Sequence, residues 1–157
     1  NYITVCGSNG ERKPIDDATK MTNFLSTESM VFNANQKNGE CSILVLHSCE
    51  TGQGDNSIAQ KFSQDMNLLV VAPTETVVVL PGYNQDPDGL QYEHGVNKVT
   101  RDENGNPEKI STRGGWNVYY KGMLVDTFDG HSKPIFKYPQ KVIEKYEKIY
   151  QERTSQQ

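Results

Sequence analysis

The stretch Ser42-Ile43-Leu44-Val45-Leu46-His47-Ser48-Cys49-Glu50-Thr51-Gly52 joins an apolar run to a polar turn. An apolar run without polar alternation predicts a strand that is buried on both faces, as in a parallel sheet covered by helices. In open sheets of this kind the chemistry lies beyond the carboxyl ends of the strands. We therefore expect Cys49 at a functional strand end. The alternative is a structural cysteine, since free Cys is among the most buried residue types.

Strand and helix patterns alternate around this stretch. The sequence predicts strands at residues 2–5 and 67–71 and helices near 17–25 and 56–66. Strands separated by helices indicate βαβ units with right-handed crossovers. We expect residues 2–5, 42–48 and 67–71 to be parallel neighbours in one sheet, with the helices covering its faces.

The second half of the chain contains more turn signals. A β-branched run at 76–80 precedes residues 81–90, whose Pro, Gly, Asn and Asp content predicts a long loop. Asn104-Gly105 predicts one hairpin, and Lys121-Gly122 predicts another between 116–120 and 123–128. Pro139 is suited to the first turn of a closing amphipathic helix. Residues 33–40 are polar and predict a turn.

Composition limits the possible functions. The chain has 157 residues, enough for one domain with a real core. Its 16 basic and 20 acidic residues give a net charge of -4, which argues against nucleic-acid binding, because that needs a basic patch. No apolar run approaches the roughly 20 residues that cross a bilayer. The chain begins at Asn1 without a charged leader, so we expect a fragment of a longer protein.

Residues 43–62, closed by Val70-Val71-Ala72-Pro73-Thr74, resemble the caspase-like cysteine peptidases of bacteria. This group includes CHAT domains, the self-processing protease domains of large secreted toxins, and C-terminal domains of Rhs-type polymorphic toxins. The resemblance covers about residues 2–75, and residues 114–118 are similar to a Gly-Gly-x-Trp element of the toxin tails. It implies an α/β fold: a caspase-like three-layer sandwich with a mainly parallel central sheet and a β-hairpin extension in the C-terminal half.

Within that fold we expect a single domain over residues 1–157. Residues 1–75 would form the core, 76–138 a β-rich extension and 139–153 the closing helix. The resemblance also implies a secreted effector or toxin domain, delivered into a target cell as part of a larger bacterial protein. Its partners would be a protein substrate and a cognate immunity protein.

The resemblance implies that the Cys49 thiolate is the nucleophile that attacks a peptide carbonyl. Turn residues around it, Ser48, Glu50 and Gly52, would present backbone amides to the oxyanion. No cofactor is expected. No metal is expected either, because the cysteines and histidines lack the short paired spacing of a zinc site.

The general base departs from the family pattern. Cys6-Gly7 stands where the family has a His-Gly pair, so three interpretations stay open: a degenerate protease, a substitute histidine, or a first strand aligned elsewhere. His47 would share a face with Cys49 at roughly 6 to 7 Å, too far for direct proton transfer, and is better explained as an interior hydrogen-bonded residue. His94 lies in a His-Gly pair after the cysteine, and His131 lies in a turn. If the base is lost, the domain is a protein-binding module.

Three cysteines argue against a disulfide scaffold. Cys41 and Cys49 bracket one strand about 26 Å apart, so they cannot bond to each other. With the first strand placed as the resemblance implies, Cys6 and Cys49 would lie at adjacent strand ends, close enough for oxidation to join them. We expect two free thiols unless the compartment is oxidising.

Overall fold

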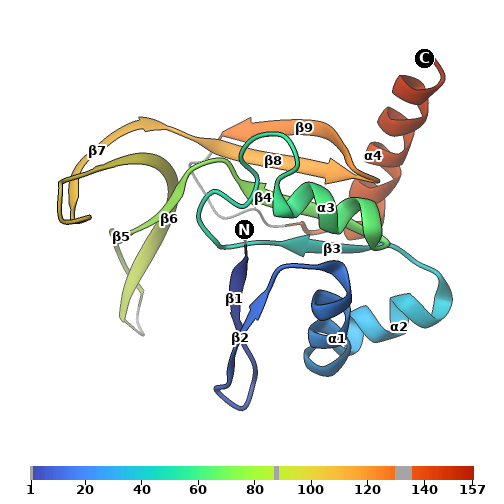
Figure 1. Ribbon diagram of the computed structural model, residues 1–157, viewed down its shortest axis with the longest axis horizontal. Coiled ribbons are helices and arrows are strands. Elements are labelled where there is room, and N and C mark those ends of the chain that lie inside the picture. Colours follow the sequence, from blue (N-terminus) through green and yellow to red (C-terminus); the bar gives the residue numbers. More distant parts are fainter. Residues whose placement is uncertain (1, 87–88, 130–135) are drawn as a thin grey trace.

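The computed structural model describes residues 2–86, 89–129 and 136–157, and within 78–96 and 110–113 the description is limited to the backbone (Figure 1). Its central sheet has the order β3-β4-β8-β9. The four strands are β3 (Ser42–Val45), β4 (Leu68–Pro73), β8 (Gly115–Tyr120) and β9 (Met123–Asp129).

Only one of the three strand pairs in this sheet is parallel. β3 and β4 are parallel from Ser42↔Leu68 to Val45↔Val71, as predicted. β4 and β8 are antiparallel, and so are β8 and β9. The expectation of a mainly parallel, caspase-like sheet is therefore wrong. Parallel strands need a crossover connection, and between β4 and β8 the described residues form antiparallel strands instead of a crossover helix.

Helices cover both faces of the sheet. α3 (Ile58–Asp65) connects β3 to β4 and buries Ile58, Ala59 and Phe62 against one face. α4 (Pro139–Thr154) has Pro139 in its first turn, as predicted, and packs on the other face. That second core consists of Leu69, Val71, Trp116, Val118, Tyr120, Val125 and Tyr146.

The N-terminal segment forms a separate hairpin. β1 (Ile3–Cys6) pairs antiparallel with β2 (Arg12–Ile15), from Ile3↔Ile15 to Cys6↔Arg12. The prediction that residues 2–5 join the central sheet is wrong. Only five residues separate the two strands, and Gly7 N–H donates to the Glu11 carbonyl at 3.0 Å to close the turn. A connection of that length fits a hairpin but not a parallel crossover.

Two helices follow the hairpin. α1 (Ala18–Glu28) corresponds to the predicted helix and is capped by the Asp17 side chain, which accepts from Lys20 N–H. α2 (Met30–Asn38) occupies residues for which the sequence predicted a turn. Ser29 caps its N-terminus and Gly39, at φ 69°, ends it. Capping by these two residues therefore specifies a helix that has little apolar periodicity.

A three-stranded antiparallel sheet extends from the body as an arm (Figure 1). Its strands are β5 (Thr76–Asp86), β6 (Gly89–Arg101) and β7 (Pro107–Arg113). The loop expected at 81–90 is instead mostly strand, whereas the hairpin turn at Asn104-Gly105 is confirmed. No helix in the described part of the chain is long and apolar enough to span a membrane.

Candidate functional site around Cys49

The loop of residues 46–57 connects β3 to α3 and lies against the ends of two strands. Leu46 N–H donates to the Val71 carbonyl at 2.9 Å, and Gly52 N–H donates to the Pro73 carbonyl at 2.9 Å. The loop ends at Ser57, whose hydroxyl caps α3 by accepting from Gln60 N–H. Backbone hydrogen bonds to β4 thus fix both halves of the loop.

Gly52 makes close contacts with β4 and β8 that the sequence did not indicate. Its carbonyl accepts from the Tyr119 hydroxyl at 2.9 Å and from the Asn117 side-chain amide at 2.9 Å. A Cβ atom at Gly52 would lie 2.6 Å from the Ala72 carbonyl oxygen, which belongs to the buried strand β4. Only glycine fits this close backbone approach.

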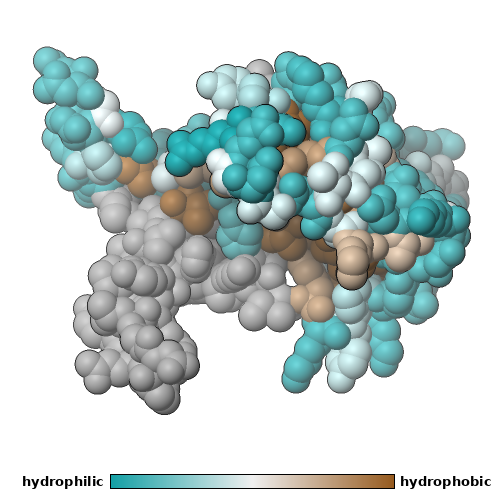
Figure 2. Space-filling model, turned by 90° about the horizontal axis from the view of Figure 1, so that it is seen from below, coloured by the Kyte–Doolittle hydropathy of each residue, from teal (hydrophilic) through white to brown (hydrophobic). Residues whose placement is uncertain are grey.

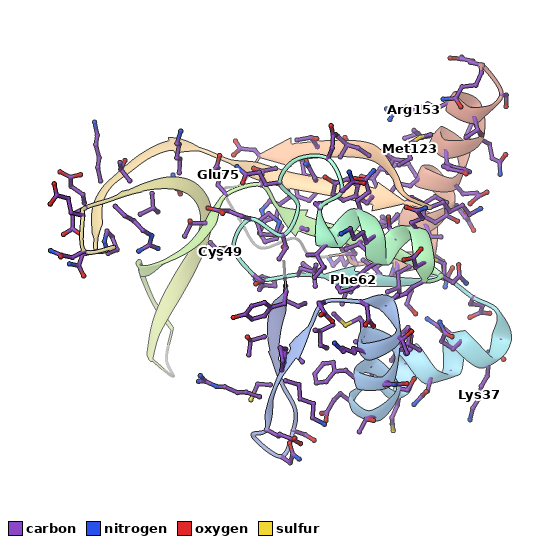
Figure 3. The ribbon with its side chains drawn as sticks, in the orientation of Figure 1. Lys37, Cys49, Phe62, Glu75, Met123 and Arg153 are labelled. Atoms are coloured by element: carbon purple, nitrogen blue, oxygen red, sulfur yellow. The ribbon has the colours of Figure 1, made fainter. Side chains whose placement is uncertain are left out.

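Cys49 is exposed at the junction between the body and the arm (Figure 3). Its Sγ accepts a hydrogen bond from Val77 N–H at 3.4 Å, and the next residue, Glu50, donates its own N–H to the Glu75 carbonyl at 3.1 Å. Glu50 has a φ of 59°, in the left-handed region. The turn therefore ties the start of β5 to the end of β3.

A polar pocket of about 450 Å³ lies beside the thiol. It is lined by Tyr2, Cys49, Glu50, Thr51, Gln53, Ser57 and Ile58. Thr51 is buried, and its hydroxyl donates to the Ser48 carbonyl at 2.8 Å. Tyr2, by contrast, is largely exposed.

Cys6 and Gly7 do not lie where the family's base would stand. Tyr2 lines the Cys49 pocket, and Cys6 is four residues farther along an extended strand, about 13 Å at 3.3 Å per residue. Gly7 lies at the opposite end of the hairpin, where a Cβ would come 3.0 Å from Glu28 Oε1. The predicted adjacency of Cys6 and Cys49 is wrong, because β1 pairs with β2 and not with β3.

All three cysteines are free thiols. Cys6 is exposed and Cys41 is half-buried. Cys41 packs against the core under α4, and its burial raises the pKa of its thiol.

His47 is exposed, although the sequence indicated an interior residue. Its ring meets the buried Trp116 edge-on, with centroids 5.6 Å apart. The His94 side chain and the whole of His131 lie outside the described residues. Among the described groups, no cluster of three or more His, Cys, Asp and Glu side chains could hold a metal ion.

Backbone amides of the turn are already used within the fold. The amides of Glu50, Thr51 and Gly52 donate to the carbonyls of Glu75, Ser48 and Pro73. An oxyanion hole needs donors that point at the substrate, so the amides of Glu50 and Gly52 do not suit the role expected for them. The described residues bring together at Cys49 a thiol, a strand-edge amide and a polar pocket.

Sequence reasoning missed the contribution of β5 and β8 to this site. Val77 supplies the amide at the sulfur, while Asn117 and Tyr119 hold Gly52. The β-branched run at 76–80 indicated a strand, but no sequence signal placed the Val77 amide at Cys49.

Comparison with protein families gives a match. The model of a family described as "Domain of unknown function (DUF8616)" matches residues 7–93, more than half of the chain. This range contains β2, α1 to α3, the Cys49 loop and β5, but not β1. Comparisons with curated proteins and with solved structures gave no match.

Proposed function

The chain belongs to the DUF8616 family of domains of unknown function, and we propose that it is a protein-binding module. It takes an extended segment of a partner protein along the outer edge of β5, beside Cys49. The observation that carries this proposal is the hydrogen bond from Val77 N–H to Cys49 Sγ. Since that amide is directed at the loop, it is directed away from β6.

The antiparallel pairing of β5 with β6 shows which other residues of β5 direct their backbone groups away from β6. Opposed residues alternate between hydrogen-bonded and non-hydrogen-bonded pairs, and Val77 is opposite Val96 in the register of β5 and β6. Val79, two residues on, therefore also directs its N–H and C=O away from β6. The same alternation places Pro81 in the outward position. Proline has no N–H and is tolerated at such an edge, so its position supports the assignment.

Between Thr76 and Pro81 the outer edge of β5 lacks the usual protection against pairing. In the part of the chain that the structure describes, β5 pairs only with β6. Native edge strands are commonly protected by charged side chains, proline or short length. β5 spans 11 residues, and between Thr76 and Pro81 it has the run Val77-Val78-Val79-Leu80, which has neither charge nor proline. An edge of this kind is suited to strand addition by an extended peptide, in which main-chain hydrogen bonds supply the affinity.

The loop at Cys49 would form one end of the binding site. Its sulfur already accepts from the outward amide of Val77, and the polar pocket beside it offers Glu50 and Gln53 to side chains of the bound segment. A partner strand would meet the thiol at the base of the arm and run outward along β5.

Removal of one outward donor tests this proposal. Peptides are first selected on the wild-type domain from a random displayed library, and their affinities are measured by fluorescence anisotropy. Val79→Pro removes the N–H that faces the partner, whereas the matched control Val79→Ala trims the side chain and keeps the N–H. We expect at least tenfold weaker binding for Val79→Pro and little change for Val79→Ala. Selected peptides that bind both variants equally, or a selection that yields no peptide, would overturn the proposal.

A cysteine peptidase with Cys49 as nucleophile is the second candidate, and the exposed thiol beside a pocket supports it. Cys6 provides an internal reference, because it is exposed as well. The binding-module proposal predicts similar iodoacetamide labelling rates at the two thiols and no casein cleavage. Labelling of Cys49 more than tenfold faster than Cys6, with cleavage that Cys49→Ala abolishes, would favour the peptidase, because an activated thiolate reacts faster.

A further inference from the structure

The Cys49 loop occupies one end of the outer edge of β5. Glu50 N–H donates to the Glu75 carbonyl at 3.1 Å, and Val77 N–H donates to Cys49 Sγ at 3.4 Å. Glu75 and Val77 are two residues apart, so backbone groups of both point to the same side of the chain. The loop therefore covers the edge as far as the Val77 amide. A segment added along β5 begins beyond that point, and one of its ends meets the loop.

Two carboxylates without ion-pair partners lie at this end of the edge. Glu50 is exposed and lines the pocket beside the Cys49 thiol. Glu75 is half-buried, and Figure 3 shows it with Cys49 at the base of the arm. In the part of the chain that the structure describes, neither carboxylate has a hydrogen bond or an ion pair. A partly buried carboxylate gains more from a nearby cation than a fully exposed one does.

The surrounding sequence supplies almost no positive charge. Between residues 38 and 97 the single Lys or Arg is Lys61, which is exposed on α3 and does not line the pocket. Lys98 belongs to β6, on the side of β5 that faces away from the loop. The same stretch contains eight acidic residues, which are Glu40, Glu50, Asp55, Asp65, Glu75, Asp86, Asp88 and Glu93. This excess of acidic residues gives the region a negative potential.

Tyr2 adds an aromatic side chain to the pocket. It is largely exposed and lines the same space of about 450 Å³ as Glu50. The face of a tyrosine ring attracts the charged group of Lys or Arg, and the aliphatic part of either side chain can pack on the ring. The pocket is therefore suited to a long basic side chain, whereas a carboxylate would meet a like charge.

Selectivity at this edge depends on polar groups. Main-chain hydrogen bonds along β5 would form with segments of almost any sequence, so side-chain pockets must distinguish one segment from another. The pocket at the Cys49 loop is polar. In the view of Figure 2, hydrophilic side chains also cover most of the surface of the described residues and surround smaller apolar areas. Charge is thus the strongest feature by which this end can select a partner.

We propose that the segment bound along β5 has a lysine or arginine at the end that meets the Cys49 loop. Its charged group would lie beside the Glu50 carboxylate and its aliphatic part against Tyr2, while Glu75 adds to the negative potential. An acidic residue or a C-terminal carboxylate at this end would be repelled. This inference rests on strand addition at β5 and names the class of segment that the edge accepts.

The peptides selected from a random displayed library test this charge. We expect Lys or Arg to be enriched at one end of the peptides that bind the wild-type domain. Replacement of that residue by Gln should weaken binding roughly tenfold or more in fluorescence anisotropy, and so should its transfer to the opposite end of the peptide. Equal binding of the basic and the Gln peptides would overturn the inference.

Substitutions in the domain locate the partner of the basic residue. Glu50→Gln removes the lining carboxylate and should weaken binding of the basic peptide about threefold or more, with no change for the Gln peptide, because two groups in contact are coupled. Asp55→Asn is the matched control, since Asp55 is exposed in the same loop but does not line the pocket. It should change neither affinity. Equal effects of Glu50→Gln and Asp55→Asn would contradict the assignment.

The failure of this inference can be distinguished from the failure of strand addition. Peptides that lose affinity for Val79→Pro but show no preference for a basic residue would overturn the charge selectivity alone. A selection that yields no peptide would overturn both proposals.

Discussion

Substitution of Gly52 by alanine should destabilise the domain more than any other single methyl group added to the Cys49 loop. The new Cβ would lie 2.6 Å from the Ala72 carbonyl oxygen and 3.1 Å from the Ala72 side chain. Ala72 is fully buried in β4, so the strand cannot move aside without disturbing both cores. The loop must move instead.

The cost follows from what the moving loop would lose. Overpacking in a dense interior costs about 1 to 3 kcal/mol, and each hydrogen bond that Gly52 makes to Pro73, Asn117 and Tyr119 contributes roughly 0.5 to 1.5 kcal/mol. We expect Gly52→Ala to lower the free energy of unfolding by about 2 to 4 kcal/mol, the strain and part of the hydrogen bonding being lost together.

Gly54→Ala is the matched control two residues away. Gly54 has a φ of 71°, and nothing lies within 4 Å of the position its Cβ would take. Its substitution should cost only the left-handed strain, about 1 to 2 kcal/mol. Urea unfolding followed by the fluorescence of Trp116, the single tryptophan, measures both variants. A Gly52→Ala variant as stable as Gly54→Ala would refute the reasoning.

Three further changes test other parts of the structure. The Tyr120 hydroxyl, with help from Gln151 and Lys121, lowers the pKa of Glu147 to about 2. The ionised Glu147 side chain contributes fully to stability above the pKa that it has in the unfolded chain. The contribution is lost as pH falls through the lower pKa that Glu147 has in the folded protein. Glu147→Gln should therefore make unfolding, measured in urea from pH 5 to 2, less dependent on pH; an unchanged profile would contradict this. Tyr119→Phe should cost about 1 kcal/mol in the same assay at neutral pH, because Asn117 still donates to Gly52, and a loss as large as for Gly52→Ala would contradict that. Asp17→Ala removes the side chain that caps α1 and should lower the free energy of unfolding by about 1 kcal/mol. An unchanged midpoint of urea unfolding would show that the cap does not contribute to stability.

The sequence predicted local elements well where one pattern specified them. The apolar run at 42–46 and the helical pattern near 56–66 predicted a strand followed by a helix, and the structure has β3, α3 and a parallel β4. Lys121-Gly122 predicted the β8–β9 hairpin, where Lys121 has a φ of 49° and Gly122 of 79°. Two residues of positive φ match the turn that joins twisted antiparallel strands.

Long-range pairing was harder to predict. The pattern at 2–5 indicated a strand but not the strand that pairs with it. Pro14 lies in that second strand, and proline is uncommon in strands, so the sequence around it did not indicate one. α2 depends on its caps and not on a strong apolar stripe, so its polar sequence resembled a turn. The candidate site shows the same limit. Cys49 could be placed beyond the carboxyl end of a strand, but its partner Val77 depends on where the arm leaves the body.

Amide hydrogen exchange along β5, with and without a selected peptide, tests the central claim most directly. Val78 and Leu80 face β6 in the ladder, whereas Val79 faces outward. In the free domain the Val79 amide should exchange faster than either neighbour, and bound peptide should slow it at least tenfold, because it then donates to the added strand. Protection of Val79 equal to that of Val78 without peptide, or unchanged exchange at Val79 in the saturated complex, would contradict the account.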